Sequence, residues 1–400
     1  MAGGVSTVSA IGNILKDRYL GPIRDQFSRN RVLEEILGHN REDIDGNSAV
    51  IPIRILGNPA IGYRGDNGAL PAAGKQTYEK VSVTMAYLYG RCSFTGPAIA
   101  ASKSNAGAFA KIMDDEMKNL VEDFRQVANH FNYGDGSGAL AICAAGTAAS
   151  TIYVDRWSKL FTVGRILDSY TAKSAGSQGM NSGVITAVDK AALTITISSH
   201  GASVGDYLFL EDTRGVCQMG LLGIVDDATF LTTHQGLSRE TYPIWKGKVL
   251  SNSGTSRTIS ESLLMDANAL LSEDKIEPNL MIGTIFQRND LIKTLQMQRQ
   301  FTNPDKKLKG GIRAIDICDT PFTWDPDCPA GYCFVGDTSV LEFYEQGPLN
   351  WMDKDGAVLN RIEGYDAYEA TLFMYRELGS SRNNAWCRIQ DLAENRPSGY

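Results

Sequence analysis

The chain has 400 residues, of which 43% are hydrophobic and 21% charged, and its net charge at pH 7 is −7. These values are typical of a folded soluble protein with room for two or three domains. The acidic balance argues against a surface that binds nucleic acid tightly, because phosphate contacts need basic side chains.

Targeting and redox signals are weak. The first residues lack the basic stretch and apolar run of a secretory signal. The longest uncharged stretch, residues 136–154, is rich in glycine, serine and threonine, so we interpret it as strand and loop and predict no membrane partner. The seven cysteines are scattered without CxxC pairs, which indicates free thiols in a reducing compartment.

Residues 1–45 are predicted to form an N-terminal arm. Gly21 and Pro22 interrupt its first apolar residues and stop any helix there. A short amphipathic segment follows, and so short a helix needs a surface to lie against. Its apolar face consists of Val32, Leu33, Ile36 and Leu37.

Two strand-like runs, 50–56 and 81–89, are separated by a long loop with five glycines and two prolines. The pattern alone fits an ordinary long hairpin as well as a projecting one. Ile61, Tyr63 and Leu70 lie near the tip of this loop, and exposed apolar residues there favour a surface that binds a partner.

A long amphipathic helix is predicted within residues 104–134. Its length, about 40 Å at 1.5 Å per residue, exceeds that of most globular helices. Its apolar residues recur every three or four positions and form one stripe. They are Phe109, Ile112, Met113, Met117, Leu120, Phe124, Val127, Ala128 and Phe131.

Residues 156–252 change character. Short strand-like runs alternate with turn residues, and no convincing helix interrupts them. This pattern predicts a small all-β module inserted into a mixed protein.

Helical periodicity returns in residues 253–318, where Thr258 and Glu261 have the spacing of a capping box. A polar loop over residues 300–311 carries Lys306, Lys307 and Lys309. Residues 319–400 are predicted to be mainly β and to end in a hairpin.

Motifs of catalysis are lacking. The sequence has no GxSxG, Walker A, HExxH or dinucleotide-binding pattern. Asp325 and Asp327 could serve as an acid–base pair, but the intervening Pro326 makes a turn the better interpretation. We therefore predict no catalytic residue, no bound metal and no cofactor.

The order of these elements resembles that of the major capsid proteins of tailed bacteriophages, which have the Hong Kong 97 fold. Four stretches carry the resemblance: Val50–Ile53, Lys80–Tyr89 running into Gly96-Pro97, Asp366–Ala370, and Arg376–Gly379. The resemblance implies an α+β fold with a long spine helix, an extended E-loop hairpin and, in this chain, an inserted small all-β domain.

The resemblance also implies a division of the chain. It comprises an N-terminal arm (1–45), an E-loop (46–95), a peripheral domain with the spine helix (96–155), an inserted β domain (156–252), an axial domain (253–318) and a β-rich return to the peripheral domain (319–400). The arm starts almost at Met1, without a scaffold-like extension, which implies a separate scaffolding protein.

By the same resemblance, the chain is expected to assemble with itself into hexamers and pentamers of an icosahedral shell that contains double-stranded DNA without gripping it. A portal and a decoration protein are further implied partners. The expected location is the virion capsid, assembled in the host cytoplasm. The residues expected at subunit interfaces are Ile61, Tyr63, Arg64, Asp66, Leu70, Lys75, Lys306, Lys307 and Lys309.

Two further expectations concern how subunits are joined. The outer loop, residues 61–74, carries one cation, Arg64, whose guanidinium stays protonated and is no nucleophile. We therefore expect a non-covalent shell with Arg64 in a charge-assisted contact across the boundary. The alternative to a capsid protein is a ligand- or carbohydrate-binding enzyme with an inserted β module, in which Asp325 and Asp327 would be the acids.

Overall fold

The computed structural model describes residues 31–44, 46–97, 110–148, 150–296, 305–307, 313–317, 320–353 and 358–395. Within them the chain is a mixed α+β protein, as the sequence predicts. Its contacts define two compact units. Of the described residues, unit 1 comprises 89–97, 110–124, 351–353 and 358–372, and unit 2 comprises the rest.

The largest sheet of unit 2 has seven strands. In spatial order they are β13 (Lys248–Leu250), β23 (Trp386–Ile389), β18 (Cys333–Gly336), β14 (Leu280–Gly283), β17 (Thr320–Trp324), β16 (Arg313–Ile317) and β15 (Asp305–Lys307). The sheet is mixed, because β14 runs parallel to β17 and antiparallel to β18. Its central strands are buried throughout, which explains their continuous apolar runs.

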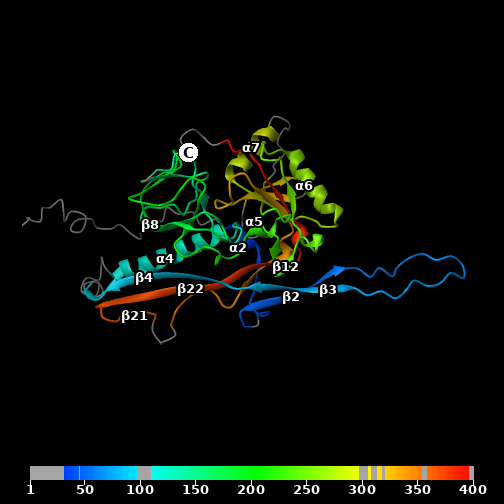
Figure 1. Cartoon of the computed structure of the whole chain (residues 1–400), viewed down its shortest axis with the longest axis horizontal. Helices are drawn as coiled ribbons and strands as arrows, with labels where there is room; N and C mark the ends of the chain where they lie inside the picture. The colour runs from blue at the N-terminus through cyan, green and yellow to red at the C-terminus, as the bar shows by residue number, and fades with distance from the viewer. Residues whose placement is uncertain are drawn as a thin grey trace, which may run out of the picture. The chain divides into compact units, whose positions relative to one another are not determined.

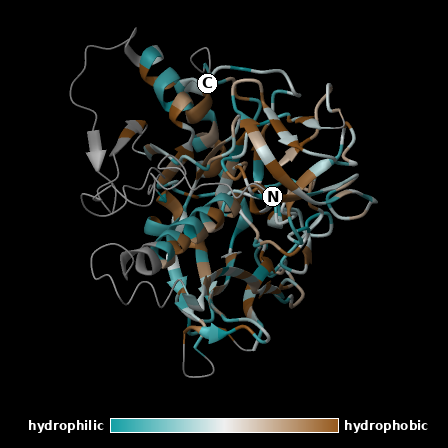
Figure 2. Ribbon diagram, turned by 90° about the vertical axis from the view of Figure 1, so that its left-hand side faces the viewer, coloured by the Kyte–Doolittle hydropathy of each residue, from teal (hydrophilic) through white to brown (hydrophobic). Residues whose placement is uncertain are grey.

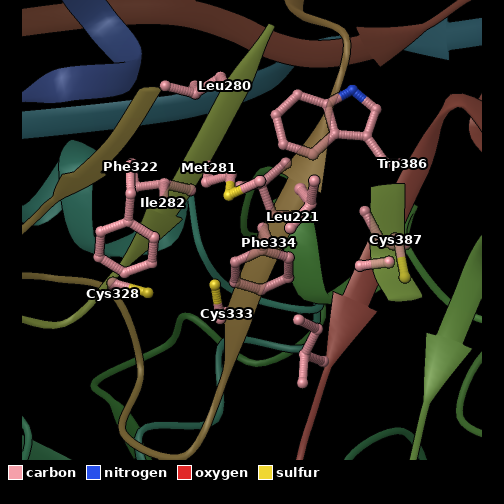
Figure 3. Packing of buried hydrophobic residues seen from close by; sticks show 14 of the residues in the cluster. Leu221, Leu280, Met281, Ile282, Phe322, Cys328, Cys333, Phe334, Trp386 and Cys387 are labelled. Atoms are coloured by element: carbon pink, nitrogen blue, oxygen red, sulfur yellow. The ribbon is translucent and has the colours of Figure 1, made fainter. Parts of the chain in front are cut away.

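The core of unit 2 is built on this sheet. Phe322, Phe334 and Trp386 pack there with Leu280, Met281 and Ile282 of β14. Figure 3 shows them together with Cys328, Cys333 and Cys387. Burial raises the pKa of the Cys387 thiol to about 12, which makes this thiol an inert core group.

Two helices lie on either side of β14 in the sequence, α6 (Glu261–Glu273) before it and α7 (Ile285–Gln296) after it. The predicted capping box at Thr258 is wrong by two residues. Ser260 is the N-cap, and its side chain accepts a hydrogen bond from the Leu263 amide. Apolar and polar residues alternate along the helices and strands, as the brown and teal segments in Figure 2 show.

A second sheet of unit 2 contains six short strands. Their order is β5 (Ala141–Ile142), β10 (Tyr207–Leu210), β7 (Ile166–Tyr170), β8 (Gln178–Asp189), β9 (Thr194–Ile197) and β6 (Thr151–Tyr153). Four of these strands, β7 to β10, lie within residues 156–252, and β5 and β6 lie before residue 156. After Leu210 the chain forms a short helix, α5 (Leu221–Ile224), and a two-stranded hairpin of β11 (Thr233–His234) and β12 (Leu237–Ser238).

The long helix α4 covers Ala110–Phe131. The predicted start of the helix, at residue 104, lies outside the described residues. Burial follows the predicted stripe: Phe124 and Ala128 are buried, while Lys118 and Asn119 are exposed. Gly90 on β4 (Ala86–Thr95) faces this stripe in unit 1, because a Cβ there would lie 3.1 Å from the Phe124 ring.

Unit 1 also contains the first half of the long strand β22 (Ala367–Ser380). Asn360 and Arg361 of β21 (Asn360–Arg361) pair with it, and β20 (Asn350–Trp351) and β4 are its other partners. Cys92 of β4 donates a weak hydrogen bond to the Ala370 carbonyl, and the Gly96 amide, just after β4, donates to the Asp366 carbonyl at 2.8 Å.

In unit 2 the second half of β22 pairs with β19 (Leu341–Glu345), and β19 pairs with β1 (Gly38–Asn40). β1 follows the short helix α2 (Val32–Ile36), whose Val32 and Leu33 are buried as predicted. His39 of β1 stacks on Phe343, and its Nδ1 lies 2.8 Å from Glu345 Oε1. Arg41 donates to the other Glu345 oxygen at 3.0 Å.

These contacts predict that the attachment of β1 weakens at alkaline pH. The hydrogen bond to Glu345 raises the pKa of His39 above 6.5, although burial and Arg376 oppose it. A raised pKa in the folded state contributes stability below pH 6.5, and this is lost as the pH rises through the raised pKa. The difference in urea midpoint between wild type and His39→Gln should therefore shrink from pH 5.5 to pH 8.5. A difference that is constant with pH contradicts this assignment.

Candidate subunit interface

The hairpin of β2 (Ser48–Leu56) and β3 (Thr77–Thr84) carries the candidate interface. Its strands pair from Ser48↔Thr84 to Leu56↔Thr77, and the connecting loop extends away from the sheets of unit 2 (Figure 1). Ile61, Tyr63 and Leu70 on this loop are 87%, 103% and 88% exposed. Three large apolar side chains are thus exposed to solvent on one loop, a feature that is typical of binding surfaces.

The base of the loop is held closed by Asn58. Its side-chain amide donates to the Gly74 carbonyl at 3.1 Å, and its oxygen accepts the Ala60 amide at 2.9 Å. The two sides of the loop are thus joined next to the strands. The residues beyond this point can change without unpairing β2 from β3.

The tip of the loop is organised by Arg64. Its Nε donates to the Ala69 carbonyl at 3.0 Å and its Nη1 donates to the Tyr63 carbonyl at 2.9 Å. The Arg64–Ala69 hydrogen bond closes a ring of residues 64–69. Within this ring, Asn67 has a φ of 58° and the Gly68 amide donates to the Gly65 carbonyl, which forms a tight turn. Arg64 therefore uses two of its donors for hydrogen bonds within the loop. The charge-assisted contact with a neighbouring subunit that the sequence analysis predicts for Arg64 stays a prediction.

The other predicted interface residues divide between two places. Asp66 and Lys75 are exposed on the same loop as the apolar residues. Lys306 and Lys307 lie on β15, the edge strand of the seven-stranded sheet, opposite Ala314 and Arg313. Lys309 lies outside the described residues. The structure thus gathers six of the nine residues on one loop and places Lys306 and Lys307 in another sheet.

The root of the hairpin depends on residues that the sequence analysis missed. Leu237 of β12 and Trp245 are buried against Ile55 of β2 and Val81 of β3. Sequence reasoning assigned residues 229–250 to the β module. The available signal was Gly236 within the polar stretch 232–239, since glycine is common in hairpin turns.

The acid pair Asp325 and Asp327 has a structural role. Asp325 is 1% exposed and accepts hydrogen bonds from the Val32 and Asp327 amides at 3.0 and 2.8 Å and from the Asn129 side chain at 3.1 Å. It thereby joins the start of α2 to α4 and β17. Burial raises its pKa to about 6, against the lowering effect of these hydrogen bonds.

Asp325→Ala is expected to cost about 2–4 kcal/mol of unfolding free energy, because it leaves buried donors without an acceptor. Asp189→Ala is the matched control. Asp189 also accepts two backbone amides, from Ala191 and Ala192, but in an exposed turn, so its loss should cost under about 1 kcal/mol. Urea unfolding of both variants measures the difference. Equal losses contradict the anchoring role of Asp325.

The described residues include no group of three or more His, Cys, Asp or Glu side chains placed to hold a metal ion. Within the same residues, no helix is both long and apolar enough to cross a bilayer.

Solved structures with the same arrangement are capsid proteins. The capsid asymmetric unit of cyanophage A-1(L) matches with a TM-score of 0.62 over 97% of this chain and 98% of that chain, at 12% sequence identity. The capsid of a native GTA particle matches with a TM-score of 0.51 over 98% of this chain and 100% of that chain, at 10% identity. This chain has a capsid-protein fold.

The capsid-protein fold is shared more widely. An encapsulin complex from Synechococcus elongatus PCC 7942 matches with a TM-score of 0.50 over 98% of both chains, at 8% identity. No protein-family model matches the sequence, and no curated protein matches it. At these identities the likeness establishes the fold.

Proposed function

We propose that this chain is the major capsid protein of a tailed bacteriophage, with the Hong Kong 97 fold. In this proposal it assembles into hexamers and pentamers of an icosahedral shell that encloses double-stranded DNA. The observation that carries the proposal is the likeness to a cyanophage capsid over nearly the full length of both chains. The exposed apolar loop of the β2–β3 hairpin supports it, since shell subunits need surfaces that a neighbour covers.

The elements take the following roles. The β2–β3 hairpin is the E-loop (46–95), and α4 is the spine helix of the peripheral domain (96–155), which is completed by residues 319–400. The seven-stranded sheet with α6 and α7 centres on the axial domain (253–318). The six-stranded sheet is the core of the inserted β domain (156–252), and two of its strands, β5 and β6, come from residues before 156. Residues 1–45 are the arm.

Particle size tests the proposal directly. We expect the purified chain, expressed with its scaffolding protein, to form closed shells or ring-shaped capsomers in negative-stain electron microscopy. A clean monomer at all concentrations contradicts it. That result is what the enzyme alternative, with Asp325 and Asp327 as its acids, requires.

An encapsulin-type assembly is the second candidate, because an encapsulin complex shares the fold. The contents of the particles discriminate between the two. Particles from infected host cells should hold nuclease-resistant double-stranded DNA, a portal and, where present, a decoration protein on the outside. Uniform shells that hold protein and no DNA favour the second candidate.

The joints between subunits are expected to be non-covalent. Arg64 is the one cation in residues 61–74, and a protonated guanidinium does not attack an amide. Particles boiled in denaturant with reducing agent should run as one band near 43.5 kDa. Lys75 and Lys80 lie nearer the hairpin's root, and a ladder of multiples that survives reduction would show that one of them forms a cross-link.

A further inference from the structure

Residues 226–247 form a segment that lies against the root of the β2–β3 hairpin, and we name it the support segment. It contains β11, β12 and the short 3-10 helix η1 (Pro243–Trp245). Figure 1 shows β12 beside the root of β2 and β3. Leu237 and Trp245 of this segment are 6% and 2% exposed, and they pack on Ile55 and Val81. The hairpin thus gains here an apolar core that two strands alone do not provide.

Hydrogen bonds also hold the support segment against β3. Gln235 and Gly236 both have positive φ, 50° and 81°, which is the geometry of a two-residue hairpin turn. The turn presents the Gln235 carbonyl to β3, where it accepts the Ser82 amide at 2.9 Å. Further along the segment, the Tyr242 hydroxyl donates to Glu79 Oε1 at 3.0 Å. Together these two bonds hold β3 at two points along its length.

The support segment is itself fixed by a buried ionic cluster. Asp226 pairs with Arg388 of β23 at 3.2 Å and with Arg239 at 3.6 Å, and all three side chains are at most 1% exposed. Arg239 also donates to the Gly223 and Ile224 carbonyls, both at 2.8 Å. The two ends of the β11–β12 excursion are therefore tied to each other and to the seven-stranded sheet.

Asp226 also orders the backbone that follows it. Its Oδ2 accepts the amides of Ala228, Phe230 and Leu231 at 3.0–3.2 Å. A buried carboxylate with this many partners holds one arrangement, because any displacement leaves charges unpaired in the core. The segment is thus a firm base and not a mobile loop.

We propose that the support segment sets the direction in which the β2–β3 hairpin leaves the subunit, with Leu237 as the main positioning residue. The importance of direction follows from the length of the loop that the strands carry. The support segment contacts the strands as far as Ile55, one residue before the end of β2. Nine extended loop residues beyond it span about 30 Å, so a rotation of the strands by about 10° would move the loop tip by about 5 Å, the spacing of neighbouring strands. The consequence for shell building rests on the proposed function, whereas the support of the hairpin does not.

Hydrogen exchange of the full-length, unassembled chain tests the proposal. Leu237→Ala should speed exchange of the β2 and β3 amides, including Ser82, by about tenfold or more. Exchange in β14 and β18 should stay unchanged. Leu160→Ala is the matched control, because Leu160 is equally buried but lies in the core of the six-stranded sheet. It deletes the same atoms and should leave β2 and β3 exchange as in wild type.

Two results overturn the proposal: an equal effect of the two leucine variants on β2 and β3, or no effect of Leu237→Ala there. If Leu237→Ala does not fold, Tyr242→Phe replaces it, since this variant removes only the bond to Glu79 and should speed exchange around that residue. Tyr78→Phe is its control, because the Tyr78 hydroxyl bonds Gln76 and not the support segment.

Assembly gives the second readout. Leu237→Ala should yield few or irregular shells where Leu160→Ala yields regular ones. Regular shells from Leu237→Ala, despite faster exchange, overturn the claim that direction matters for assembly. If exchange responds as expected but wild type forms no shells, the support role stands and the proposed function fails.

Discussion

Deleting Gly62–Ala73 is expected to leave a folded, soluble subunit that no longer builds shells. The deleted residues contribute nothing to the buried clusters, and Tyr63 and Leu70 among them are almost fully exposed. Asn58 already joins the two sides of the loop to Gly74, so a shorter connection can close there. The loss should therefore fall on contacts between subunits and not on folding.

Electron microscopy counts the particles, and thermal unfolding with circular dichroism verifies the fold. A second variant, in which Ile61, Tyr63 and Leu70 are all replaced by serine, keeps the length of the loop. It separates the effect of losing the apolar side chains from the effect of shortening the loop. It should fold and still lose most shells, since it removes the exposed apolar groups. Normal particles from the deletion variant would refute an interface on this loop.

Phe124→Asp is the substitution with the largest expected effect on stability. Phe124 is 4% exposed on the apolar stripe of α4, and its ring lies so close to Gly90 that a Cβ there would be 3.1 Å away. An aspartate there is a buried charge without a partner. We expect a loss of about 4 kcal/mol or more of unfolding free energy and little soluble protein.

The control for this variant is Asn119→Asp on the same helix. Asn119 is exposed, so the same new carboxylate stays in water and should cost under about 1 kcal/mol. Soluble yield and urea unfolding compare the two. Equal losses would show that the added charge, and not its burial, destabilises α4.

Local patterns in the sequence predicted the elements whose signal is periodic. The α4 stripe from Met117 to Phe131 and the alternation in β2 and β3 follow directly from side chains that must be buried on one face. The exposed tip of the loop was equally legible, because glycine, proline and isolated apolar residues cannot make a core. Within the α6 region the cap was misplaced, since Thr258 and Ser260 are both capable caps and only tertiary packing selects one.

Contacts between distant residues could not be predicted. Asp325 bonds the Val32 amide across 293 positions, and Arg388 meets Asp226 across 162. Neither contact can be recognised from the spacing of residues in the sequence, because each needs only complementary groups that the fold brings together. The support segment was missed for the same reason: its role depends on what Leu237 contacts, and the sequence shows only a single leucine among polar residues.

The ring that Arg64 closes at the loop tip has a consequence for the release of misplaced subunits during shell assembly. A tip that is ordered before it meets a neighbour loses little conformational entropy on docking. Under the proposed function, each contact then forms quickly and, without a covalent bond, can also be undone. A misplaced subunit can leave before the lattice closes around it, so accuracy would come from reversibility at each joint and permanence from the number of joints.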